Sequence, residues 1–131
     1  MTKSVLPFLM FQGEASAALD LYASVFPDSR IDELERYGAG SPGPEGGIRR
    51  ARFTVGGQSV LLYDSPIKHA FSFTPSFSFM VQCDTEEELR RLSDALKDGG
   101  SELMPAGAYG FSSLFAWVVD RFGVSWQLNL P

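Results

Sequence analysis

Among the side chains that are typical of acid–base or nucleophilic chemistry, the chain of 131 residues has a single histidine and a single cysteine. The histidine, His69, is the candidate catalytic base, because histidine is the residue type most often used for proton transfer near neutral pH. The alternative is a histidine that is exposed or merely packed, because it lies in a linker-like stretch. The one cysteine, Cys83, has no base beside it in sequence, so we interpret it as a small buried filler rather than a nucleophile.

A glutamine near the end of the chain is the main candidate for ligand contact. Residues 124–130 alternate, with Val124, Trp126 and Leu128 on one face and Gln127 between Ser125 and Asn129 on the other. If the apolar face lies under a helix, Gln127 points toward a ligand on the opposite side. The alternative is an amide that has hydrogen-bond partners and no chemical role.

The same alternation predicts a pocket that is mostly apolar, with a few neutral hydrogen-bonding groups. Such pockets usually bind small, flat or partly apolar molecules. Besides Gln127, the predicted ligand contacts are Met10, Arg52, Leu61, Tyr63, Ser76, Ser78 and Met80. Arg50 and Arg52 have two interpretations: contacts to an anionic ligand, or a solvated strand face.

Several other polar or aromatic residues have simpler structural explanations. Asp64 and Asp120 are interpreted as turn formers. Trp117 and Trp126 are expected in the core, and the three glutamates of residues 86–88 suit the first turn of a helix.

An internal repeat must position these residues. The final stretch, FAWVVDRFGVSWQLNL, resembles ARFTVGGQSVLLYD at residues 51–64, with Gly57 aligned to Gly123. Each reads as a hairpin, because its glycine-containing turn can adopt the positive φ angles that tight loops need. FLMFQGE near the start likewise aligns with SFMVQCD, which places Met10 over Met80.

Each repeat is predicted to fold as βαβββ. In the first, a strand over residues 5–12 precedes an amphipathic helix that ends before Pro27. Residues 29–37 are ambiguous and are assigned as a strand; a loop at 38–47 and a hairpin follow. In the second, a strand precedes a helix with a Thr85-x-x-Glu88 capping box and a Gly99-Gly100 stop, then a short strand at 102–104, a loop at 105–111 and a hairpin. We expect one domain made of modules 4–64 and 75–130, joined by a linker at 65–74.

Composition limits the possible partners. The net charge is −5 and the basic residues are scattered, which argues against nucleic acid or an anionic membrane as a partner. The single cysteine excludes an internal disulfide, and the apolar run at residues 5–11 is too short for a signal or transmembrane segment. The cytoplasm is the expected compartment.

PFLMFQGEASAALDLYASVFPDSRI near the start and the closing DRFGVSWQL resemble the PhnB-like branch of the vicinal oxygen chelate (glyoxalase and bleomycin-resistance) superfamily. The resemblance covers nearly the whole chain. It implies an α+β fold in which two tandem βαβββ modules form a curved, mostly antiparallel eight-stranded sheet around a central cup. Some relatives are labelled 3-demethylubiquinone-9 3-methyltransferase, but the chain has no Gly-rich strand-to-helix turn for a nucleotide cofactor, so we expect no cofactor.

The resemblance also locates the positions that hold a metal ion in other members. The last-strand positions fall on Leu61 and Gln127, and the first-strand positions fall near Leu6 or Pro7 and near Ser76. None of these is a histidine or a carboxylate, the usual ligands of a divalent ion there. We therefore expect no metal site.

Two functions from different classes follow. The first is a metal-free protein that encloses a small molecule in the cup, similar to the antibiotic-sequestering members. The second is an enzyme of the same superfamily: a metal-free lyase or isomerase that uses His69 or a cup residue, or a metal-dependent enzyme, dioxygenase-like, with displaced ligands. An interaction role is a third alternative. The resemblance further implies a homodimer.

Overall fold

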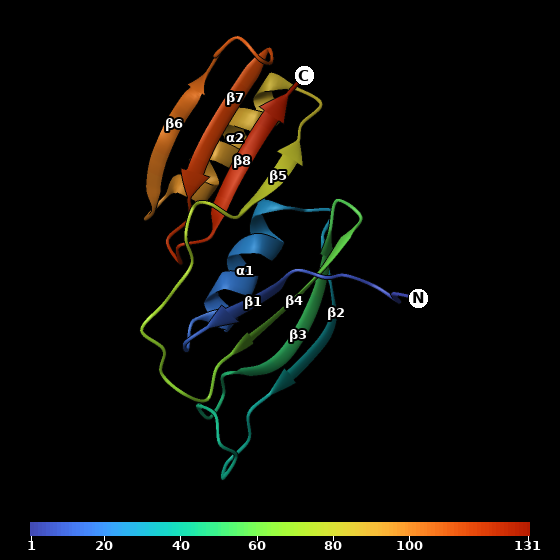
Figure 1. Cartoon of the computed structure of the whole chain (residues 1–131), viewed down its shortest axis with the longest axis vertical. Helices are drawn as coiled ribbons and strands as arrows, with labels where there is room; N and C mark the ends of the chain where they lie inside the picture. The colour runs from blue at the N-terminus through green and yellow to red at the C-terminus, as the bar shows by residue number, and fades with distance from the viewer. The chain divides into compact units, whose positions relative to one another are not determined.

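Each half of the chain folds into one four-stranded sheet with one helix on it (Figure 1). The computed structural model describes all 131 residues, in two units, Met1–Ala70 and Phe71–Pro131. The boundary between the units lies inside the predicted linker, residues 65–74. Neither helix is long and apolar enough to cross a membrane.

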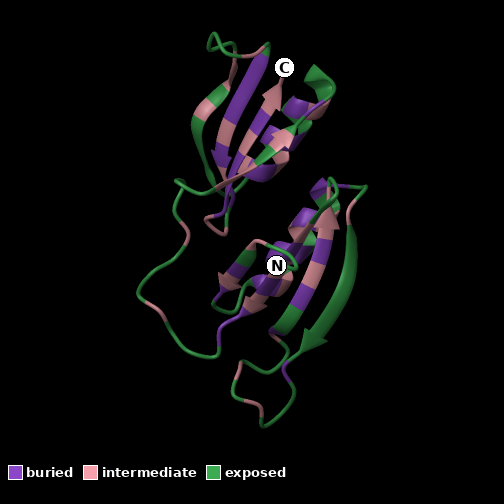
Figure 2. Cartoon of the chain, turned by 45° about the vertical axis from the view of Figure 1, so that its right-hand side comes forward, coloured by how far each residue is buried: buried purple, intermediate pink, exposed green.

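The first unit has the predicted βαβββ order. Its elements are β1 (Phe8–Phe11), α1 (Ala15–Val25), β2 (Arg30–Arg36), β3 (Ile48–Val55) and β4 (Gln58–Asp64). The strand order in space is β1-β4-β3-β2, with β1 parallel to β4 and the other pairs antiparallel. The ambiguous segment at 29–37 is therefore a strand, as assigned. It shows no apolar alternation because β2 is an edge strand whose residues are all exposed (Figure 2).

The second unit repeats this order. Its elements are β5 (Ser78–Gln82), α2 (Glu86–Lys97), β6 (Ser101–Gly107), β7 (Leu114–Val119) and β8 (Ser125–Leu130). The strand order is β5-β8-β7-β6, again with one parallel pair, β5 with β8. The predicted α+β fold with eight mostly antiparallel strands is confirmed, and the strands are divided between two four-stranded sheets.

The second strand of the second unit is longer than expected. The sequence predicted residues 102–104 and a loop from Pro105, whereas β6 continues to Gly107. Proline is compatible with this strand because β6 is an edge, hydrogen-bonded only to β7, and its register shifts on both sides of Met104. The sequence pattern alone does not reveal which strand is an edge.

The helix stops and hairpin turns form as predicted. Gly56 and Gly57 have φ angles of 55° and 82°, and they join Val55 to its partner Gln58 as a two-residue loop. In α2, Thr85 Oγ1 accepts the Glu88 N–H at 3.1 Å. The Glu88 carboxylate reaches back one residue further than in a standard capping box, to the N–H of Asp84.

In each unit the core lies between the helix and one face of the sheet. In α2 the buried stripe contains Leu89, Leu92 and Leu96, and on β8 Trp126 and Leu128 are buried. This confirms the predicted inner face of the last strand. Figure 2 shows the alternation of buried and more exposed residues along β3 and β4. The opposite face of each sheet, here called the open face, carries the candidate site residues.

Candidate ligand-binding faces

A chain of hydrogen bonds crosses the open face of the second sheet. Trp117 Nε1 donates to Ser125 Oγ at 2.8 Å, Ser125 Oγ lies 2.6 Å from Ser78 Oγ, and Gln127 Nε2 donates to Ser78 Oγ at 3.2 Å. We call these four residues the serine network. Ser125, in the middle of the network, is buried and only 1% exposed, whereas Gln127, at its end, is half-buried.

Strand register explains why these side chains meet. Ser78 pairs with Ser125 and Met80 with Gln127 across β5 and β8, and Gln127 pairs with Trp117 across β7 and β8. Residues opposite one another share a face, so the predicted contacts Ser78, Met80 and Gln127 lie together. The placement of Trp117 in the core was wrong, because its register with Gln127 puts it on the open face.

One predicted contact of this unit lies off the strand. Ser76 precedes β5, is exposed, and its hydroxyl lies 2.7 Å from Thr74 Oγ1. The alternation that suggested Ser76 does extend to it in sequence, but the strand begins only at Ser78. The hydrogen bond with Thr74 is local to this turn.

The open face of the first sheet is apolar at its centre. Met10 pairs with Tyr63 across β1 and β4, and Leu61 pairs with Phe8 on one side and Arg52 on the other. Four predicted contacts therefore lie on one surface. The sequence reasoning missed Phe8, which is 63% exposed and whose ring centroid lies 5.0 Å from that of Tyr63. Phe8 lies two residues before Met10 on the same strand, and this spacing could have predicted that the two share a face.

His69 connects the segment that follows β4 with the end of β1 through hydrogen bonds. Its Nε2 lies 2.8 Å from Ser65 Oγ, and its backbone N–H donates to Gln12 Oε1 at 2.9 Å. Ser65 in turn donates its backbone N–H to the carbonyl of Phe11. The structure thus gives His69 contacts that explain its presence without catalysis.

Cys83 is a buried thiol, as expected. It is 3% exposed, and burial, with a smaller contribution from the charge of Glu88, raises the pKa of the Cys83 thiol to about 11. Nucleophilic cysteines need the opposite shift, because the thiolate is the reactive form. The interpretation as a filler is confirmed.

The two aspartates at the strand ends do more than form turns. Asp120 Oδ1 accepts the N–H groups of Phe122 and Val124, which is the predicted turn, and its Oδ2 accepts the indole N–H of Trp126 at 3.0 Å. The interpretation of Asp64 was wrong. This residue is fully buried, and its carboxylate accepts backbone N–H groups of residues distant in sequence: Gly13 at 2.8 Å, Ala15 at 2.9 Å and Ile48 at 2.9 Å.

The positions that hold a metal ion in other superfamily members do not fit one here. Leu61 offers no donor atom, and Gln127, whose Nε2 donates to Ser78, offers only a neutral amide oxygen. No group of three or more histidine, cysteine, aspartate or glutamate side chains is placed to hold a metal ion anywhere in the chain. A neutral amide with aliphatic neighbours is a poor donor set for a divalent cation.

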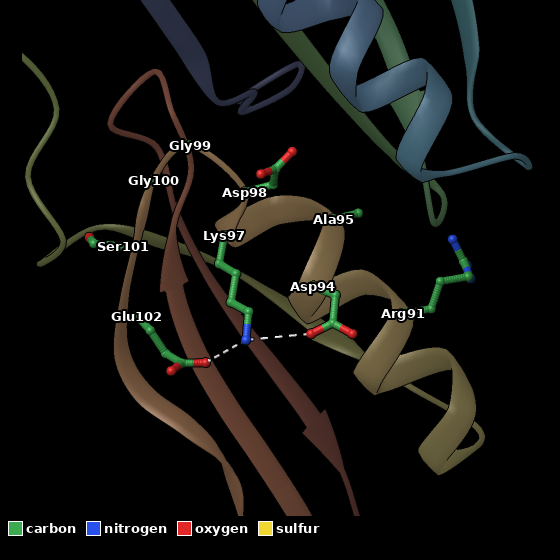
Figure 3. Close-up of a pocket in the computed structure, with 9 residues that line it drawn as sticks. All are labelled: Arg91, Asp94, Ala95, Lys97, Asp98, Gly99, Gly100, Ser101 and Glu102. Atoms are coloured by element: carbon green, nitrogen blue, oxygen red, sulfur yellow. Dashed lines mark hydrogen bonds and ion pairs between the residues drawn. The ribbon is translucent and has the colours of Figure 1, made fainter.

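A shallow depression on the second unit lies away from the serine network (Figure 3). It is open to solvent and lies where α2 ends and β6 begins, and three of its charged groups are paired with one another. Lys97 Nζ lies 3.0 Å from Glu102 Oε2 and 3.4 Å from Asp94 Oδ1. The hydrogen bond to Glu102 is the main reason that the pKa of Lys97 is raised. We assign no ligand to this depression.

Comparison with known proteins agrees with this fold. Residues 3–129 match the family described as 3-demethylubiquinone-9 3-methyltransferase. A PhnB protein from Bacillus cereus has a solved structure that is 43% identical, with a TM-score of 0.94 over 98% of this chain and 100% of that one. Protein YjdN of Escherichia coli is 25% identical, over 95% of this chain and 92% of its own length.

A more distant structure shares the fold alone. The fosfomycin resistance protein FosX from Listeria monocytogenes, a member of the vicinal oxygen chelate superfamily solved with Mn(II), is 11% identical. Its TM-score is 0.70, with 98% of this chain and 93% of that one covered. The family match over almost the whole length leads to one conclusion: the chain belongs to the PhnB-like family described as 3-demethylubiquinone-9 3-methyltransferase.

Proposed function

We propose that this protein is a metal-free small-molecule-binding protein of the glyoxalase and bleomycin-resistance type, with a ligand held against the open face of a sheet. The observation that carries the proposal is the serine network, in which neutral groups meet at Gln127, one of the superfamily's metal-ligand positions. A few fixed neutral donors and acceptors beside apolar side chains suit the binding of a partly apolar molecule.

The contacts proposed for the ligand are those that the strand register groups together. On the sheet of the second unit, the proposed contacts are Gln127, Ser78 and Met80. On the sheet of the first unit, the proposed contacts are the apolar group Leu61, Tyr63 and Met10, with Arg52 beside them. Ser76 is kept as a peripheral contact, since it lies two residues before β5.

Native mass spectrometry of the purified protein tests this proposal. We expect an organic adduct and no divalent ion. The adduct is then identified, and its affinity is measured for the wild type and for Gln127→Ala. Loss of one neutral hydrogen bond should weaken binding about threefold to tenfold.

Gln58→Ala is the matched control, because Gln58 is exposed and its amide hydrogen-bonds only to the carbonyl of the next residue. It should leave affinity unchanged. One tightly bound divalent ion per subunit would contradict the proposal, and equal affinity of Gln127→Ala and the wild type would return Gln127 to a structural role.

The second candidate function is a metal-free lyase or isomerase with His69 as the base. One observation favours it: Nε2 of His69 lies 2.8 Å from Ser65 Oγ, a distance at which a proton can pass. In this case the wild type would convert the identified ligand, and His69→Gln would abolish turnover while binding persists. Absence of turnover by the wild type would leave the binding function alone.

We further propose that the protein acts as a homodimer in the cytoplasm and has neither nucleic acid nor a membrane as partner. The net charge of −5 supports the last two points. Support for self-association comes from likeness to the superfamily and from large apolar side chains that are exposed on the chain: Ile67, Phe71, Phe77 and Phe111.

A further inference from the structure

One arginine on the open face of the first sheet has an unmet donor. Arg52 lies on β3, with Leu61 as its partner on β4 and Glu33 as its partner on β2. Its Nε is buried and has no hydrogen-bond acceptor in the protein, the one such side-chain atom in the chain. An unsatisfied buried N–H is costly, and a charged one more so, which makes this atom a place where an acceptor on a ligand would gain most.

The carboxylates on the neighbouring strand are engaged elsewhere. Glu33 Oε2 lies 3.5 Å from Arg50 Nη2. Asp32 accepts from Thr54 Oγ1 at 2.6 Å and from Arg30 Nε at 2.7 Å, and these two hydrogen bonds hold its pKa below the usual value. Arg52 forms no ion pair with either of them. Asp32 interacts with Arg52 only through its charge, so the Arg52 Nε donor has no acceptor in the protein.

An apolar, partly aromatic surface lies on the other side of Leu61. The rings of Phe8 and Tyr63 are 5.0 Å apart and inclined by 33°. Phe8 is the partner of Leu61 on β1, so it stands two strands from Arg52, roughly 10 Å across the sheet. This spacing fits a small molecule with one charged end and one flat apolar end.

We propose that the ligand carries an anionic group, a carboxylate or a phosphonate, on a flat apolar body. In this arrangement the Arg52 side chain turns outward, and its Nε, which is shielded from solvent in the structure, binds the anion together with a neighbouring Nη, the paired geometry that guanidinium offers to such groups. The flat body rests on Leu61 against Phe8 and Tyr63. The inference rests on the proposed binding function and specifies its ligand class.

Benzoate and benzamide are suitable probes, because they share ring and shape and differ in charge. Each is titrated into the isotope-labelled protein, and the side-chain Nε–Hε resonances of arginine and the backbone amides are followed by NMR. In the wild type we expect benzoate to shift the Arg52 Nε–Hε resonance and to bind at least about tenfold more tightly than benzamide.

Arg52→Gln should remove this preference, with benzoate weakened about tenfold or more. Arg49→Gln is the matched control: it makes the same charge change three residues away on the same strand, at a side chain that is 59% exposed and ion-paired with Glu35. It should change benzoate affinity less than threefold. The backbone amide spectrum shows whether each variant is folded, and the wild-type shifts give a readout that needs no variant.

Equal binding of the two probes, with no shift at Arg52, would overturn the anionic ligand class and leave the binding function standing. Failure of both probes to shift any resonance of this face up to their solubility would overturn the inference as well. The binding function is judged separately, by the adduct in the native mass spectrum and its dependence on Gln127.

Discussion

At the scale of single residues, Asp64 has the largest positioning role in the first unit. Its carboxylate joins the start of α1, the start of β3 and the end of β4 through three backbone donors. The N-cap residue of α1, Glu14, makes no side-chain capping bond, so Asp64 supplies the acceptor from another strand. A negative charge there also complements the helix dipole.

Asp64→Ala should therefore destabilise the protein strongly. It leaves the N–H groups of Gly13, Ala15 and Ile48 without their acceptor, and each unmet buried donor costs about 1 to 3 kcal/mol. We expect a loss of at least about 3 kcal/mol in the free energy of unfolding, measured with urea. Asp20→Ala, at an exposed position of α1, should change it by less than about 0.5 kcal/mol; similar values for both would contradict this role.

The buried thiol predicts a pH dependence of stability. Burial raises the pKa of Cys83 from 9.0 to about 11, so at high pH the unfolded chain loses this proton before the folded one. The contribution of the protonated Cys83 thiol to the free energy of unfolding is fully present below pH 9 and is lost as the pH rises toward 11. Over that interval the wild type should lose about 1 kcal/mol more stability than Cys83→Ala. Parallel curves for the two proteins, measured by urea unfolding at each pH, would count against this shift.

At the scale of elements, the turn between α2 and β6 shows why the predicted helix stop needs two glycines. Gly99 adopts a φ of 77°, and Gly100 donates its N–H to the carbonyl of Lys97 at 2.8 Å. A Cβ on Gly100 would lie 2.0 Å from the carbonyl oxygen of Val119. The second glycine is therefore required by packing against the end of β7, beyond any role in ending the helix.

Gly100→Ala should cost about 2 kcal/mol or more, because neither the turn nor the strand end can yield without losing hydrogen bonds. Gly38→Ala is the control. A Cβ there meets nothing within 4 Å, and the residue has no positive φ, so the change should be neutral or slightly stabilising. Thermal unfolding of both variants distinguishes these outcomes; a tolerated alanine at position 100 would mean that β7 moves aside easily.

At the scale of the whole molecule, the proposed homodimer is the main prediction. Sedimentation velocity at micromolar concentration should show a species of twice the 14.4 kDa chain mass. If exposed apolar side chains drive the association, moderate salt should leave it intact, because screening acts on charges and not on apolar contact. A monomer under these conditions would remove the dimer from the proposal.

The sequence was sufficient for most features that depend on local pattern. Alternation at a period of two identified the inner and open faces, so Gln127, Ser78 and Met80 were correctly grouped on one side of β5 and β8. Glycine turns, the Thr85 cap and the leucine stripe of α2 were likewise visible, because each depends on residues within a few positions of one another.

Only the tertiary structure decided which distant groups meet. The donors to Asp64 lie up to 51 residues away, the half-buried place of Trp117 follows from its register with Gln127, and the unmet Nε of Arg52 follows from burial and from where Glu33 finds its partner. Hydrogen bonding and burial are set by strand order and register, which bring together residues that carry no sign of one another in the sequence. The faces were therefore readable from the chain, whereas the polar contacts on them were not.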